Sequence, residues 1–126
     1  MAFVFCNVNP FNNETIDCVI RGISTVTDQD WDTTYTELFV KGFAMKLLPV
    51  TNAVWSSYLK SKGFKRYVIP DTCPDCYTIK EFCYDNPEGT YLLATGSHVV
   101  AVKDGNYYDI WDSGNEIPIY YWKREE

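Results

Sequence analysis

Apolar residues recur at helical spacing in the N-terminal half of the chain. A first helix is predicted to start near Asn13 or Thr15, either of which is a suitable N-cap. Its apolar face is formed by residues three and four positions apart, Ile16, Val19, Ile20 and Ile23. At 100° per residue, Cys18 falls on the opposite side of this helix, in its first or second turn. There the positive end of the helix dipole favours an ionised thiol.

Two further helices are predicted from the same kind of spacing. The second runs from Asp28 to about Gly42. Its inward-facing stripe consists of Trp31, Tyr35, Leu38 and Phe39. The third covers about residues 51–62, and Gly63 is its expected C-terminal stop.

Short apolar runs between turn residues dominate the C-terminal half, and such runs predict strands. The expected strands are residues 66–69, 90–95, a hairpin within 96–112, and 117–122, with a short edge strand at 2–5. A brief helix is expected among them, because Thr78 and Glu81 match a capping box. Helices followed by strands indicate an α+β fold, with N-terminal helices packed against a C-terminal antiparallel β-sheet. Residues 1–126 are predicted to form a single domain.

The predicted hairpin contains His98, the one histidine of the chain, at the start of its first arm. Asp104-Gly105 is a strong signal for the turn. A two-residue loop at 104–105 puts Asp109 on the same side of the sheet as His98. A three-residue loop with Gly105 in the left-handed position instead makes Asp112 the diagonal neighbour of His98. The residues alone leave both registers open.

A cysteine, a histidine and a carboxylate together can perform acyl transfer. A thiolate is the nucleophile, and a neighbouring imidazole lowers the pKa of the thiol and later protonates the leaving group. A third polar group holds the imidazole in the productive tautomer. Taken singly, Cys18 is more commonly a packing residue and His98 an ordinary side chain. Their order along the chain and their place on the predicted elements favour the catalytic interpretation.

Two segments resemble small papain-fold proteins of bacteriophages and Firmicutes. Residues 17–24, Asp-Cys-Val-Ile-Arg-Gly-Ile-Ser, are similar to the cysteine motif of that family, and residues 95–114 are similar to its histidine hairpin. The resemblance implies a papain-like fold with Cys18 as nucleophile, His98 as base and Asp112 as the residue that orients His98. Papain-like enzymes usually place a glutamine oxyanion donor about six residues before the cysteine. Asn12 is the candidate here, with a shorter side chain.

The function expected from this resemblance is a thiol hydrolase, a peptidase or amidase encoded by a phage and acting on a peptide or protein in the host cytoplasm. The alternative is a non-catalytic papain-fold protein that binds a host defence or regulatory factor. Selective reaction of Cys18 with a thiol reagent near neutral pH distinguishes the two.

Charge and cysteine content exclude other classes. With 11 Lys and Arg against 17 Asp and Glu, the chain has a net charge of −6 and is a poor nucleic-acid binder. No apolar stretch approaches the ~20 residues of a membrane span. Five cysteines, an odd number, suit a reducing cytoplasm. Cys73, Cys76 and Cys83 lack the second close pair typical of zinc sites, so no metal and no cofactor are predicted. The oligomeric state is not predicted.

Overall fold

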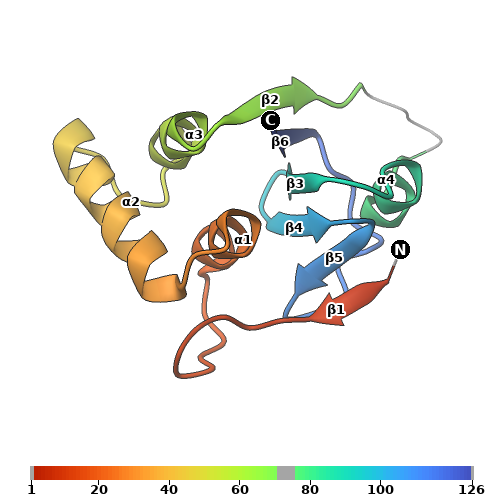
Figure 1. Cartoon of the computed structure of the whole chain (residues 1–126), viewed down its shortest axis with the longest axis horizontal. Helices are drawn as coiled ribbons and strands as arrows, with labels where there is room; N and C mark the ends of the chain where they lie inside the picture. Colours follow the sequence, from red (N-terminus) through yellow and green to blue (C-terminus); the bar gives the residue numbers. More distant parts are fainter. Residues whose placement is uncertain (1, 71–75, 126) are drawn as a thin grey trace.

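The computed structural model of the chain describes residues 2–70 and 76–125, which form four helices and a six-stranded mixed sheet (Figure 1). The helices are α1 (Cys18–Thr27), α2 (Trp31–Met45), α3 (Asn52–Ser61) and α4 (Ile79–Asp85). The strands are β1 (Phe3–Phe5), β2 (Phe64–Val68), β3 (Thr90–Ala94), β4 (Val99–Lys103), β5 (Asn106–Asp109) and β6 (Tyr120–Arg124). Across the sheet their order is β1-β5-β4-β3-β6-β2. The α+β class is therefore as predicted.

The sheet is mixed, although a wholly antiparallel one was predicted. The N-terminal strand β1 adds to the edge parallel to β5, with Phe3 beside Tyr107. Every other pair of neighbouring strands is antiparallel. The last strand, β6, begins at Tyr120, after Pro118, which has no N–H to give to a ladder.

Helices cover both faces of the sheet. Helices α1 and α3 pack on one face, where Trp55 and Trp122 are fully buried together with Leu92. Helix α4 packs on the other face, against Leu93 and its neighbours. Leu92 and Leu93 point to opposite sides because successive strand residues alternate, so β3 is buried on both faces. In Figure 1, α2 lies outside α1 and α3, farthest from the strands.

Helix α1 begins later than predicted. Its N-cap is Asp17, and Ile16, expected on the apolar stripe, lies before the helix with 98% of its surface exposed. The preceding segment is held in turns instead, because the buried Asn9 side chain accepts hydrogen bonds from the backbone N–H groups of Phe11 and Asn13. Cys18 thus becomes the first residue of the helix, within the turn that was predicted.

Helix α2 buries a different face from the one predicted. Its buried residues are Thr34, Leu38 and Gly42, four positions apart, whereas Tyr35 and Phe39 are about half exposed, at 43% and 52%. At Gly42 the loop that follows α2 packs closely on the helix, because a Cβ at that position would lie 2.6 Å from the carbonyl oxygen of Leu47. The apolar stripe of the sequence is therefore split between the core and the surface.

The other two helices agree with the prediction. Thr51 and Lys62 are the caps of α3, and Gly63 follows in the left-handed region with φ 88°. At α4, the Thr78 side chain accepts from the Glu81 N–H, and the Glu81 side chain accepts from the Thr78 N–H. None of the helices within the described ranges is long and apolar enough to cross a membrane.

Candidate functional site

The β4–β5 hairpin decides which carboxylate reaches His98. Lys103 pairs with Asn106, so the loop consists of two residues, Asp104 and Gly105. Both have positive φ, 51° and 79°, as a type I′ turn requires. This is the first of the two registers left open by the sequence, the one that places Asp109 on the side of His98.

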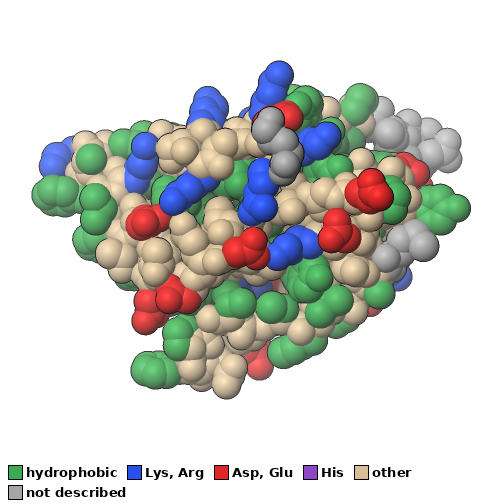
Figure 2. Space-filling model, viewed as in Figure 1, with side chains coloured by type: hydrophobic (Ala, Val, Ile, Leu, Met, Phe, Trp, Pro, Cys, Tyr) green, Lys and Arg blue, Asp and Glu red, His purple; other side chains and the backbone are tan. Residues whose placement is uncertain are grey.

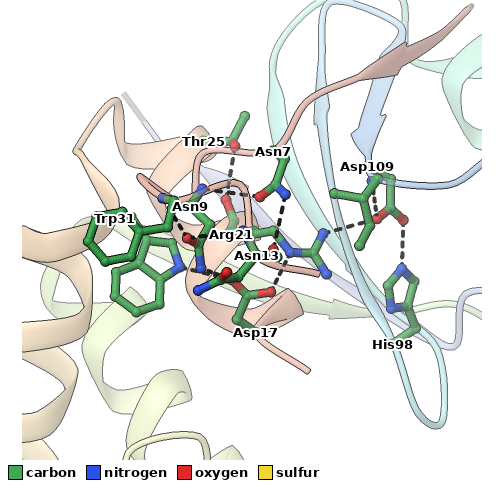
Figure 3. A network of polar contacts seen from close by, with 11 residues as sticks. Asn7, Asn9, Asn13, Asp17, Arg21, Thr25, Trp31, His98 and Asp109 are labelled. Carbon is green, nitrogen blue, oxygen red and sulfur yellow. Dashed lines mark hydrogen bonds and ion pairs between the residues drawn. The ribbon is translucent and has the colours of Figure 1, made fainter. Parts of the chain in front are cut away.

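His98 and Asp109 form a short contact within a buried environment (Figure 3). The His98 Nε2 atom lies 2.6 Å from Asp109 Oδ2, and the carboxylate is only 1% exposed. Asp109 also accepts hydrogen bonds of 2.8 Å from the Ser113 hydroxyl and from the Ile110 N–H. The carboxylate is held from three directions, so it fixes the imidazole ring in one orientation.

The Cys18 thiol meets the same imidazole. His98 is among the groups that lower the pKa of this thiol, and because Nε2 is engaged by Asp109, Nδ1 is the ring nitrogen left to interact with the sulfur. The Val99 N–H also donates to the sulfur. Burial of Cys18 alone would raise its pKa, but His98, the Val99 N–H and the charge of Arg21 outweigh burial and lower the pKa of the thiol.

The pKa of His98 is shifted in the opposite direction to that of Cys18. Burial alone would lower its pKa, but the hydrogen bond and charge of Asp109, with the contribution of Cys18, raise the pKa of His98 to about 9. The same contacts, with those from Ser113 and Ile110, overcome burial and lower the pKa of Asp109. The lowered pKa of Cys18 and the raised pKa of His98 favour a thiolate–imidazolium pair near neutral pH. The Trp111 ring, 5.1 Å from the imidazole between centroids, covers part of it.

Asp112, predicted to orient His98, lies elsewhere. It accepts hydrogen bonds from the Tyr107 hydroxyl at 2.5 Å and from the Gly114 N–H at 3.0 Å. The contact expected of Asp112 is therefore made by Asp109. The physical reason is that successive side chains along a strand alternate between the two faces of the sheet. Residues 109 and 112 are three positions apart, so with the two-residue loop they point to opposite faces.

Arg21 joins the site from within α1, and sequence analysis did not identify it. Its Nε atom donates to Asp17 Oδ1 at 2.7 Å, and its Nη1 atom donates to Asp109 Oδ1 at 3.2 Å. All three side chains are at least 90% buried. In Figure 3 the guanidinium lies between the two carboxylates. The spacing of Asp17 and Arg21, i and i+4 on a helix, was the signal available in the sequence.

The network continues away from His98. Asp17 Oδ2 accepts from the Trp31 indole N–H at 2.9 Å and from the Asn9 amide at 3.4 Å. Because Asp17 is bonded by side chains, it does not cap α1 through its own carboxylate. One continuous set of bonds thus ties the start of α1, the start of α2 and the end of β5 to the imidazole.

A cleft of about 390 Å³ opens beside Cys18 and His98. Trp55, Tyr120 and Ile119 contribute to its walls, and among the residues that the structure describes no Asp, Glu, Lys or Arg lines it. Asn12, the predicted oxyanion donor, does not line it either. Asn12 is exposed in a turn with φ 55°, where its backbone N–H donates to the Asn9 carbonyl. Asn12 lies six residues before Cys18, the spacing expected of the oxyanion donor, but the turn places it away from the cleft.

The remaining cysteines are separate from this site. Cys6, Cys76 and Cys83 are free thiols, and Cys83 lies on the buried side of α4, where burial raises its pKa to about 11. Cys73 lies outside the described residues. Within residues 2–70 and 76–125, no group of three His, Cys, Asp or Glu side chains is placed to hold a metal ion.

Comparison with known proteins finds no match for this chain among family models, curated proteins or solved structures. The site places three groups in series: the Cys18 thiol of lowered pKa, the cationic imidazole of His98 and the buried carboxylate of Asp109. They lie next to a cleft that can admit an acyl group.

Replacing Asp109 and Asp112 separately tests which carboxylate controls the imidazole. Asp109→Asn is expected to lower the pKa of His98 from about 9 toward its ordinary value, because the anion that stabilises the imidazolium is removed. Asp112→Asn is expected to leave it unchanged. Titration of the His98 ring followed by NMR measures both variants, and equal shifts would contradict the assignment.

Proposed function

We propose that this chain is a papain-like thiol hydrolase, a peptidase or amidase, with Cys18 as nucleophile, His98 as acid and base, and Asp109 as the residue that orients His98. The observation that supports it is the Cys18–His98–Asp109 series, whose last link measures 2.6 Å. A nucleophile at the start of a helix, a histidine at the start of a strand and a carboxylate on the next strand occur here in the order of papain-like enzymes.

The proposed reaction has two steps. The Cys18 thiolate attacks the acyl carbon, a C–S bond forms and the C–N bond breaks, and the His98 imidazolium gives its proton to the departing amine. Water then attacks the thioester, His98 takes a proton from that water, and the C–S bond breaks to restore the thiolate. The product is a carboxylic acid, and the imidazolium is regenerated.

Transition-state charge on the acyl oxygen needs hydrogen-bond donors. The backbone N–H of Cys18 belongs to the first turn of α1, where N–H groups have no partner within the helix. The α1 backbone therefore supplies one hydrogen-bond donor for the acyl oxygen. Because Asn12 lies away from the cleft, a slow enzyme is expected, since one missing donor costs about 10²–10³ in rate.

The reactivity of Cys18 tests the proposal directly. Alkylation by iodoacetamide is expected to fall less steeply from pH 8 to pH 6 than that of free cysteine, because the lowered pKa of Cys18 and the raised pKa of His98, about 9, favour the ion pair. Free cysteine in the same buffers slows by about tenfold per unit below its pKa of about 8.5. Peptide mapping by mass spectrometry identifies the labelled residue, and Cys18→Ala is the control.

Hydrolysis is assayed with a mixture of peptides from a digested protein, in which mass spectrometry detects new termini. The native chain is expected to produce them and Cys18→Ala to produce none. Cleavage that survives in Cys18→Ala disproves the mechanism. A Cys18 that alkylates no faster than free cysteine at pH 6 disproves the ion pair and favours a non-catalytic binding protein.

A further inference from the structure

Helix α2 exposes a stripe of apolar side chains along its outer face. Phe39 and Phe43 are 52% and 68% exposed, and Tyr35 is 43% exposed. At 100° per residue, Tyr35 and Phe43 lie about 40° to either side of Phe39 around the helix. Large exposed apolar patches on a folded domain mark interaction sites. Figure 2 shows hydrophobic side chains gathered at the left edge of the molecule, where Figure 1 places α2.

The stripe is ordered in the isolated chain. The rings of Trp31 and Tyr35 stack at 5.0 Å between centroids, and those of Tyr35 and Phe39 at 6.3 Å. Trp31 is in turn anchored by its hydrogen bond to Asp17. A pre-ordered surface loses little side-chain entropy when it is covered.

Charges of opposite sign bracket the stripe. Asp32 lies seven residues before Phe39, and Lys46, which ends the helix, lies seven residues after it. Seven residues are close to two full turns, so both charges lie on the stripe itself. The Lys46 ammonium rests 4.0 Å above the Phe43 ring. The stripe is therefore acidic at one end, aromatic in the middle and basic at the other end.

This pattern is complementary to itself. If a second copy lies antiparallel across Phe39, then Tyr35 meets Phe43, and Asp32 meets Lys46, twice each by symmetry. A two-fold axis through Phe39 thus brings apolar side chains together and pairs every charge on the stripe with its opposite. A parallel arrangement would set like charges against each other.

A groove at the basic end can receive the second copy. It measures about 340 Å³ and is lined by Phe39, Phe43, Leu48 and Pro49, among others. Leu48 is 74% exposed. In the antiparallel arrangement the ring of Tyr35 from the second copy faces this groove, and the groove on the second copy receives Tyr35 in return.

We infer that α2 is the interface of a two-fold symmetric homodimer, with the two α2 helices packed antiparallel across Phe39. One helix pair and its adjoining loops bury less than a standard interface of about 800 Å² per partner, so the dissociation constant is expected in the micromolar range. This inference is independent of the hydrolase proposal, because none of the stripe residues belongs to the Cys18 site.

Sedimentation equilibrium of the full chain between 1 and 300 µM tests the inference. The native chain is expected to pass from monomer to dimer within that range. Phe39→Asp is expected to raise the dissociation constant at least tenfold, because it places two carboxylates at the two-fold axis. Tyr84→Asp, at a 69% exposed aromatic on α4, is the matched control and is expected to leave dimerisation unchanged. Circular dichroism confirms that each variant is folded.

A charge exchange tests the antiparallel register. Asp32→Lys and Lys46→Asp are each expected to raise the dissociation constant about threefold to tenfold, because each places like charges opposite each other. The double variant is expected to return to within about twofold of native. A chain that stays monomeric at 300 µM overturns the dimer. A dimer insensitive to Phe39→Asp overturns the interface, and a double variant weaker than both single variants overturns the register.

Discussion

Arg21→Met is expected to lower the free energy of unfolding by about 3–5 kcal/mol, the usual cost of removing one partner from a buried ionic network. The substitution leaves the carboxylates of Asp17 and Asp109 buried, 5% and 1% exposed, without the cation that lies between them. Methionine fills a similar volume, so the loss reports mainly on charge and hydrogen bonding. Urea denaturation followed by tryptophan fluorescence measures the change.

An exposed ion pair provides the control for Arg21→Met. Lys103 binds Asp28 at 2.8 Å, but the two side chains are 30% and 65% exposed. Lys103→Met is therefore expected to cost no more than about 1 kcal/mol. Arg21→Lys should recover part of the loss, since it keeps the charge but not the two-sided hydrogen bonding of the guanidinium. If Arg21→Met and Lys103→Met were equally mild, the Arg21 network would not stabilise the fold as described.

His98→Gln is expected to abolish hydrolysis and to slow alkylation of Cys18 at pH 6.5 by tenfold or more. Without the imidazolium, the thiol returns at least to an ordinary pKa of about 8.5, where about 1% is ionised at pH 6.5. The higher intrinsic nucleophilicity of a more basic thiolate offsets only part of that fall. Hydrolysis is affected more than alkylation, because only hydrolysis needs a proton donor for the leaving amine.

Asp109→Asn separates the effect of the imidazole on Cys18 reactivity from the effect of the carboxylate behind it. That variant keeps the imidazole and removes the anion behind it, so its rate of Cys18 alkylation is expected to fall between those of the native chain and of His98→Gln. Stopped-flow alkylation at pH 6.5, with thermal melts of each variant, gives the order. Full reactivity of Cys18 in His98→Gln would show that another group ionises the thiol.

The hairpin was the most predictable part of the molecule, because its geometry is local. Asp104 and Gly105 favour a two-residue turn with positive φ, and from that turn the facing of Asp109 follows by alternation alone. The sequence also allowed a three-residue loop, in which alternation brings Asp112 to His98, and resemblance favoured that choice. The structure has the two-residue loop, and Asp109 makes the contact.

Other features depend on contacts that apolar spacing does not encode. The start of α1 was misplaced because the buried amide of Asn9 holds the preceding turns. Tyr35 and Phe39 were predicted to be buried because they continue a helical stripe, but α2 meets the core through Thr34, Leu38 and Gly42. The parallel pairing of β1 with β5 joins segments about a hundred residues apart, and no local signal specifies it.

The position of β6 has a consequence for the order in which the sheet and the cleft can be completed. This strand is inserted between β3 and β2, although it is the last of the described strands along the chain. Until residue 124 has been synthesised, β2 has no neighbour through which to join the sheet, and such non-local pairings form slowly. Because the Trp55 ring of α3 packs against Trp122 of β6, with 6.4 Å between centroids, the cleft wall that Trp55 forms is completed only when β6 joins the sheet.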